Sequence, residues 1–529
     1  MFALCLVLVT AADGVVRGLD AKFPALYRHS ASLGIAISQV AHGTSGFVGL
    51  TEVAQALERG GIALIPNEPT RLLDLARNPK LADEALRSAA ELQVLDRTQT
   101  FVLHGNETGM IDFYALALRL FGYHVQGFYW LFFALLATLT VCFVVSFRDR
   151  PVLIVPCLLW LLLLLVAVHE LDPADIGAGA GTPASARFLP MLSILAVIFV
   201  TTLAISGNSV SARDLATTAL AAGVFAVCAN ARSFALWQLC AVVGLLAAGI
   251  TARALLAVRK YRSHFANLAL WPLALFVLLA VGLISLHHVR RDNQAYSAAT
   301  RIGHPFWPSY LSATLQAFSS ELPELERQSG VNIGTNPDAY VGARLRVEVR
   351  KRGETLDKYV DANGWINAAR EGLARAIVFD LWKRSPLRML ETYGRAVVDA
   401  VALVAEKLAW LAACVATLPL VALAGHPLIW AIWGLFFVWL GGASALINVL
   451  ALGLLLLMPA AARRCAAEML PSLSLIALFG MTTILVMPVV RPDTIDYPYF
   501  TWFVLLMCLW AKLDVIGLGK RLRRRMGLT

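Results

Sequence analysis

The sequence predicts an all-α protein that crosses a membrane many times. Hydrophobic residues make up 58% of its 529 residues, charged residues make up only 15%, and the mean hydropathy is +0.68. A soluble globular domain carries far more charge than this. Apolar runs of about 17 to 25 residues, the length that spans the hydrocarbon core as a helix, recur along the chain. The alternating segments typical of a membrane β-barrel do not occur in it.

Runs of this length predict about twelve membrane helices. Two long polar segments interrupt them, and we expect both to be extracytoplasmic loops that contain interface helices. No Lys or Arg precedes the first apolar stretch, as the start of a signal peptide would require, so this stretch is predicted to be the first membrane helix. The predicted segments are the first membrane helix (1–17), a first loop (18–126), membrane helices two to seven (127–287), a second loop (288–400), membrane helices eight to twelve (401–517) and a basic tail (518–529).

The short loops predict the orientation of the chain. Arg148, Arg150, Lys260 and Arg464 all fall on one side of the predicted helices, together with the basic tail, whereas the short loops of the other side carry few positive charges. Because Lys and Arg of short loops stay in the cytoplasm, both termini are predicted to be cytoplasmic and both long loops external. The abundant Ala, Leu and Arg indicate a bacterial chain, so we expect it in the inner (plasma) membrane.

Several common chemistries have no motif in this sequence. All eight cysteines stand in or beside predicted membrane helices, so the long loops offer no disulfide framework and no cysteine-based metal site. The patterns GxxxxGK[ST], HExxH and GxSxG do not occur. We therefore expect neither an ATP-driven pump nor a zinc protease. No cofactor is predicted, although the need for a divalent cation is left open. The net charge of +10 fits attraction to membrane lipids and not to nucleic acid.

Two carboxylates, Glu107 and Asp112, are the candidate catalytic residues. They lie in the polar turn HGNETGMIDF, just before a helical pattern and a membrane span that begins near Gly127. A carboxylate at this place is suited to accept the proton of an acceptor hydroxyl. The alternative is that the two acids only cap the start of the helix, where the helix dipole favours negative charge.

A second group of residues stands at the predicted external ends of the helices. Arg232 lies in a very short turn between two apolar spans, where a charge is costly unless it reaches water or a partner. The planar guanidinium group binds phosphate well. The aromatic members of the group would alternatively be ordinary residues of the membrane interface. The candidate substrate-binding residues are Arg187, Arg232, Trp237, His304, Trp307, Arg491 and Tyr497.

Two features of the sequence resemble the GT-C superfamily of membrane glycosyltransferases. One is the long first loop, with its acidic residues and interface helices. The other is the segment AREGLARAIVFDLWKRSPLRMLETYGRAV, which is similar to a piece of bacterial relatives of the protein mannosyltransferases and lipid A sugar transferases. In this segment an amphipathic helix is followed by Ser385 and Pro386, which suit the cap and first turn of a second helix. GT-C enzymes usually carry an acidic pair soon after the first helix, and the nearest counterpart here is Glu107 with Asp112.

The resemblance implies an integral membrane glycosyltransferase of the cell envelope. It would transfer a sugar from a polyprenyl-phosphate donor to an envelope acceptor at the extracytoplasmic face, so its partners would be that donor and the membrane lipids. Glu107 or Asp112 would be the base, and Arg232 would bind the phosphate with help from Arg187 or Arg491. Two alternatives stay open. A lipid or polysaccharide transporter or flippase would need polar or broken helices at the bilayer midplane, and a non-catalytic envelope-assembly protein would use its loops for docking.

Overall fold

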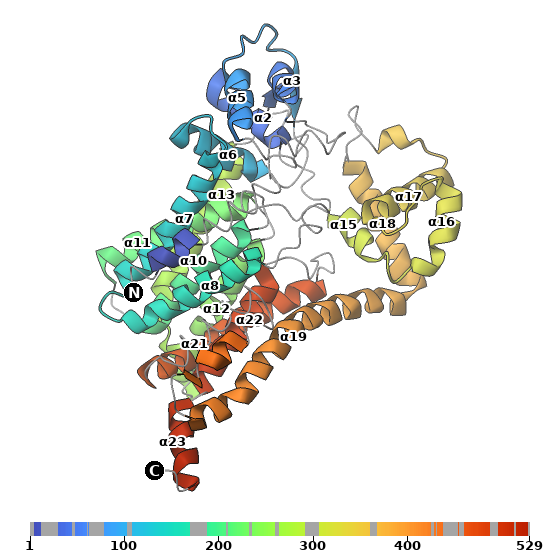
Figure 1. The fold of residues 1–529 in the computed structure, drawn as a ribbon. Helices are drawn as coiled ribbons and strands as arrows, with labels where there is room; N and C mark the ends of the chain where they lie inside the picture. Colours follow the sequence, from blue (N-terminus) through green and yellow to red (C-terminus); the bar gives the residue numbers. More distant parts are fainter. Residues whose placement is uncertain are drawn as a thin grey trace.

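The computed structural model is almost entirely helical, with an apolar bundle, a small domain at one end of it and a second domain beside it (Figure 1). Among the described residues, the only strands are β1 (Val48–Leu50) and β2 (Thr100–Val102), which pair antiparallel. The described residues are 5–11, 30–44, 48–60, 62, 79–102, 108–169, 188–207, 210–231, 235–259, 264–290, 306–359, 368–424, 428–429, 431–436, 453, 460–486, 496–512 and 515–526.

Six helices in the described part of the chain are long and apolar enough to cross a membrane. The chain is therefore a multi-pass helical membrane protein. The predicted total of about twelve spans is not confirmed. Part of the segment predicted to form membrane helices eight to twelve (401–517) lies outside the described residues. The six helices are α7 (Gln126–Ser146), α10 (Leu189–Ser206), α11 (Ala212–Ala231), α12 (Leu236–Arg259), α13 (Leu270–Arg290) and α21 (Ala460–Val486).

The central helix of the bundle is α10. All of its residues from Leu189 to Ala204 are buried, and it packs against each of the other five spanning helices. Pro190 stands in its first turn, where the missing N–H costs nothing. Gly207 ends it with a φ of 65°, a left-handed conformation that glycine adopts without strain. Around it lie the shorter apolar helix α8 (Val155–His169), which continues the 3-10 turn η2 (Pro151–Ile154), the turn η4 (His264–Asn267) and α22 (Asp496–Lys512).

The first loop forms a small domain on top of α7. Asp83 anchors it, because the carboxylate of Asp83 accepts a hydrogen bond from the backbone N–H of Val125 (2.9 Å) and pairs with His124 (2.9 Å) at the start of α7. Leu57 and Leu86 are fully buried between its helices. The domain consists of α2 (Ser30–His42), β1, α3 (Thr51–Arg59), α5 (Pro79–Ala90), β2 and α6 (Thr108–Phe121).

The second loop forms a domain with its own hydrophobic core, separate from that of the bundle. One helix, α19, joins it to the membrane helices: it runs without a break over 39 residues and ends beside the basic helix α23 (Figure 1). The boundary predicted at residue 400 therefore falls inside a helix. The domain consists of α15 (Phe306–Ala313), η5 (Ser319–Glu321), α16 (Leu322–Ser329), α17 (Pro337–Lys351), η6 (Leu356–Lys358), α18 (Ala368–Arg384) and the start of α19 (Pro386–Ala424); α23 spans Val515–Arg525.

The predicted helix break at Ser385 and Pro386 is confirmed. Helix α18 ends at Arg384 and α19 begins at Pro386. Proline has no backbone N–H and clashes with the preceding turn, so it is tolerated at the start of a helix and not within one. The break lets α18 fold back onto α15 while α19 continues toward the bundle.

An ionic network fastens the second-loop domain to α19. Arg344, on α17, donates to Glu321 (2.7 Å), and Arg388, on α19, donates to the other oxygen of the same carboxylate (3.1 Å). Arg344 is almost buried, and its guanidinium group also lies over the rings of Phe318 and Tyr340, at 5.6 and 5.3 Å from their centroids. The carboxylate of Glu321 therefore pairs with two cations at once.

Replacing Glu321 should loosen this domain. We expect Glu321→Gln to lower its free energy of unfolding by about 1.5–3 kcal/mol, because a mostly buried guanidinium group loses its charged partner. Hydrogen exchange of the α17 amides in the full-length protein measures the loss. The matched control is Glu391→Gln, which breaks the exposed pair with Arg395 and should cost less than about 0.5 kcal/mol. Equal losses of unfolding free energy in Glu321→Gln and Glu391→Gln would contradict a stabilising role of the network around Glu321.

Candidate functional site

The start of α6 lies directly against the end of α11. A methyl group on Gly109 would overlap the backbone of Asn230 and Ala231, so only glycine lets the two helices come this close. In the sequence Glu107 stands just ahead of α6 and Arg232 just after α11. The chain next to Glu107, a predicted base, therefore lies against the chain next to Arg232, the predicted phosphate-binding residue. Glu107 and Arg232 themselves lie outside the described residues.

Asp112, the second candidate acid, pairs with a histidine of another helix. Its Oδ2 lies 2.5 Å from Nδ1 of His287, near the end of α13. The Asp112 side chain is 48% exposed, whereas that of His287 is only 11% exposed. A carboxylate that holds one ring nitrogen of a histidine orients the imidazole and fixes its tautomer, and such a histidine is a common general base. This pair is the best candidate for acid–base chemistry in the described part of the chain.

The pair and the glycine contact belong to one end of the bundle. Helix α11 packs against both α6 and α13, so Gly109, Asp112 and His287 surround its C-terminal end. His287 is not among the residues predicted from the sequence. The only signal in the sequence was the position of His287 at a predicted external helix end.

Two other predicted residues, Trp237 and Tyr497, lie against each other. Their rings meet edge to face with centroids 6.1 Å apart, and both side chains are buried. The indole Nε1 of Trp237 donates to Asp496 (2.8 Å), whose carboxylate also accepts from the amide of Gln238 (3.3 Å). Gln238 in turn donates to the carbonyl of Pro190 (2.9 Å). This polar cluster ties the starts of α10, α12 and α22 together, and its aromatic faces are occupied by protein.

Trp307 lies in the second-loop domain. Its backbone N–H donates to Glu371 (3.1 Å), and its ring lies 4.9 Å from that of Phe306 and 5.3 Å from that of Phe379, measured between centroids. Phe379 is half exposed, so this aromatic cluster reaches the surface of the domain. A face of this kind is suited to stack on an apolar or sugar ring.

The remaining predicted substrate-binding residues, Arg187, His304 and Arg491, lie outside the described residues, as Glu107 and Arg232 do. The structure therefore describes four of the predicted residues. It places Asp112 beside His287, Trp237 beside Tyr497, and Trp307 in a separate domain. Their roles in substrate binding and catalysis stay predictions.

Comparison with known proteins gives no relative from which a role could be transferred. No protein-family model, no curated protein and no solved structure matches the chain. The resemblance to GT-C glycosyltransferases is therefore carried by the sequence features alone.

The contact at Gly109 can be tested by substitution. We expect Gly109→Ala to separate α6 from α11 and to destabilise this end of the bundle by about 1–3 kcal/mol, because the added methyl group overlaps backbone and not a movable side chain. Hydrogen exchange of the α6 amides should speed up accordingly. Gly223→Ala is the matched control: Gly223 lies on α11, a methyl group there would meet no atom within 4 Å, and alanine should stabilise the helix by about 0.5–1 kcal/mol. Unchanged exchange in Gly109→Ala would contradict the tight contact.

Glu371 should make the second-loop domain sensitive to pH. Burial raises the pKa of Glu371, against the opposing effect of the backbone N–H groups of Trp307 and Phe306. A carboxyl whose pKa is raised by folding contributes stability below its unfolded pKa, about 4.3, and this contribution is lost as the pH rises through the folded value. Glu371→Gln should therefore raise the midpoint of thermal unfolding at neutral pH relative to the parent protein and flatten its decline from acid to neutral pH.

The control for this pH effect is Glu324→Gln. Hydrogen bonds from Arg327 and Gln328 lower the pKa of this exposed carboxyl, so its contribution is present above its unfolded pKa and is lost as the pH falls. The two variants should therefore change the pH dependence in opposite directions. If the midpoint of thermal unfolding changed with pH in the same way in Glu371→Gln and in the parent protein, burial would not raise the pKa of Glu371.

Proposed function

We propose that the chain is a membrane glycosyltransferase that acts at the end of the bundle where α6 meets α11 and α13. It would move a sugar from a polyprenyl-phosphate donor to an acceptor hydroxyl of the cell envelope. The observation that supports this proposal most is the Asp112–His287 pair, which lies beside the close contact between Gly109 and Asn230. An Asp–His pair and the chain neighbours of Arg232, the proposed phosphate-binding residue, occur at one helix junction.

The residues divide the reaction between them. The acceptor hydroxyl gives its proton to the Asp112–His287 pair or to Glu107, and its oxygen forms the new bond to the anomeric carbon of the sugar. The bond from that carbon to the phosphate oxygen breaks, and the electron pair leaves with the lipid phosphate. Arg232, with Arg187 or Arg491, would stabilise the charge of the departing phosphate through paired hydrogen bonds. The apolar bundle would hold the polyprenyl tail.

The charge distribution favours this reading over a transporter. In the six candidate spans, the charged residues stand toward the helix ends, such as Arg213 and Asp214 at the start of α11 and Glu468 in the third turn of α21. The central turns of these spans carry no charge. A transport path would need polar or broken helices at the midplane.

A docking protein of envelope assembly is the second candidate. Leu387 and Leu390, on the first turns of α19, are 79% and 56% exposed, and Phe379 on α18 is 51% exposed. An apolar face of this kind on a domain with its own core is typical of a protein or membrane contact. The two candidates differ in whether the purified protein transfers a sugar.

Sugar transfer from a labelled polyprenyl-phosphate donor, in membranes that contain the full-length protein, tests the proposal. We expect Asp112→Asn and His287→Gln each to lower the rate by about 10²–10⁴-fold, the usual contribution of a general base. Glu107→Gln should do the same if Glu107 shares this role. Arg232→Lys should weaken transfer because a point charge replaces a planar fork.

A second Asp–His pair provides the matched control. Asp83 and His124 pair at 2.9 Å at the start of α7, outside the junction of α6, α11 and α13. His124→Gln keeps the bond from the Val125 N–H to Asp83 and should leave transfer near that of the parent protein. Full transfer by Asp112→Asn, His287→Gln and Glu107→Gln would rule out this site. No transfer by the parent protein with any donor would favour the docking candidate.

A further inference from the structure

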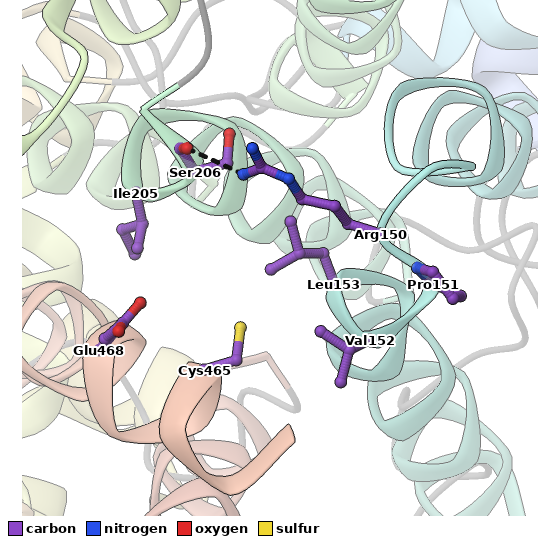
Figure 2. Close-up of a pocket in the computed structure, with 8 residues that line it drawn as sticks. All are labelled: Arg150, Pro151, Val152, Leu153, Ile205, Ser206, Cys465 and Glu468. Carbon is purple, nitrogen blue, oxygen red and sulfur yellow. Dashed lines mark hydrogen bonds between the residues drawn. The ribbon is translucent and has the colours of Figure 1, made fainter. Parts of the chain in front are cut away.

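A cavity of about 310 Å³ opens at the opposite end of the bundle from α6. Figure 2 shows that it lies between the turn that follows α7, the end of α10 and the start of α21. Val152, Leu153 and Ile205 give it an apolar wall, and Arg150 and Glu468 face it from different elements. The cavity therefore combines a cation, an anion and an apolar surface at the level where helix ends meet lipid headgroups.

The two charges of the cavity form no ion pair with other described residues. The guanidinium group of Arg150 donates to the carbonyl of Ser206 (3.2 Å), which uses one of its five N–H donors. Arg148 and Arg213, by contrast, both lie 3.6 Å from Asp149. Within the described residues, the exposed Glu468 forms no hydrogen bond or ion pair, and its charge acts on His264 from a distance. Arg150 and Glu468 are thus available to a ligand.

We propose that this cavity binds the headgroup of a phospholipid that carries both a phosphate and a primary ammonium group, such as phosphatidylethanolamine. The phosphate lies on Arg150 and the ammonium group on Glu468. The glycerol and the first acyl methylenes follow the apolar wall formed by Val152, Leu153 and Ile205. The site is independent of the proposed glycosyl transfer, and it lies at the end of the bundle that the charge pattern predicts to be cytoplasmic.

The charge pair selects among lipids. A guanidinium group binds any lipid phosphate, so Arg150 alone would take phosphatidylglycerol equally well. Glu468 adds an attraction to an ammonium group and a repulsion toward a purely anionic headgroup. A simpler role for Arg150, as the C-terminal cap of α10, would affect stability but would give no preference between the two lipids.

Native mass spectrometry of the full-length protein with added phosphatidylethanolamine or phosphatidylglycerol, matched in acyl chains, tests the proposal. We expect the parent protein to prefer phosphatidylethanolamine by roughly threefold to tenfold, the range for one charge-assisted contact. Glu468→Gln should remove this preference, and Arg150→Gln should weaken binding of both lipids. Arg150→Lys keeps the charge and should retain the preference for phosphatidylethanolamine. This variant still tests the role of the positive charge if Arg150→Gln folds poorly.

Arg148→Gln is the matched control, since Arg148 is a neighbouring exposed arginine that already has Asp149 as its partner; its lipid binding should equal that of the parent protein. Soluble phosphoethanolamine should not displace the lipid at the same concentration, because it lacks the apolar part. Equal affinity of the parent protein for the two lipids would overturn the proposal. So would an equal loss in Arg148→Gln and Arg150→Gln, or full displacement by phosphoethanolamine.

Discussion

The burial of α10 on all sides determines how the bundle is arranged. A helix inside a membrane must satisfy every backbone polar group within the protein, and its last carbonyls have no partner in the helix itself. Neighbouring elements supply these partners: the N–H of Ala269 donates to the carbonyl of Ala204 (2.7 Å), and Arg150 donates to that of Ser206 (3.2 Å). In the first turn of α10, whose carbonyls already accept bonds within the helix, Trp160 and Gln238 add side-chain bonds to the carbonyls of Met191 and Pro190, both at 2.9 Å.

These bonds fix where the neighbouring helices begin and end. The positions of the helix ends in turn decide where the charged candidate residues lie. Charged groups are costly at the membrane midplane, so they gather where helices end. Around α10 the helix ends form two layers, one with the Asp112–His287 pair and one with the cavity beside Arg150 and Glu468. Each layer combines residues from segments that are far apart in the sequence, which is why neither is visible as a motif.

Properties that depend on a short stretch of chain were predictable from the sequence. The apolar length of α7 and α10 and the break at Pro386 are local, and the structure agrees with the sequence analysis on all three. The continuity of α19 was not predictable in this way: its apolar face changes partner from the second-loop domain to the bundle, and the change in composition near residue 400 looked like a boundary. Pairing partners such as His287 depend on packing between helices, on which periodicity carries no information.

The two Asp–His pairs of the described chain differ in which partner is exposed to solvent. The imidazole of His124 is 47% exposed, and the other carboxylate oxygen of Asp83 accepts a hydrogen bond from the backbone N–H of Val125 at the start of α7. Asp83 is 18% exposed, so in this pair the carboxylate is the inner partner and holds the first-loop domain on α7. In the other pair the order is reversed, because His287 is 11% exposed and Asp112 is 48% exposed. Asp112 itself stays half exposed, which leaves the pair reachable by a substrate. The half-exposed carboxylate of Asp112, with the mostly buried imidazole of His287 behind it, is the member of the pair that an acceptor hydroxyl can reach. It lies at the junction that the small size of Gly109 makes possible.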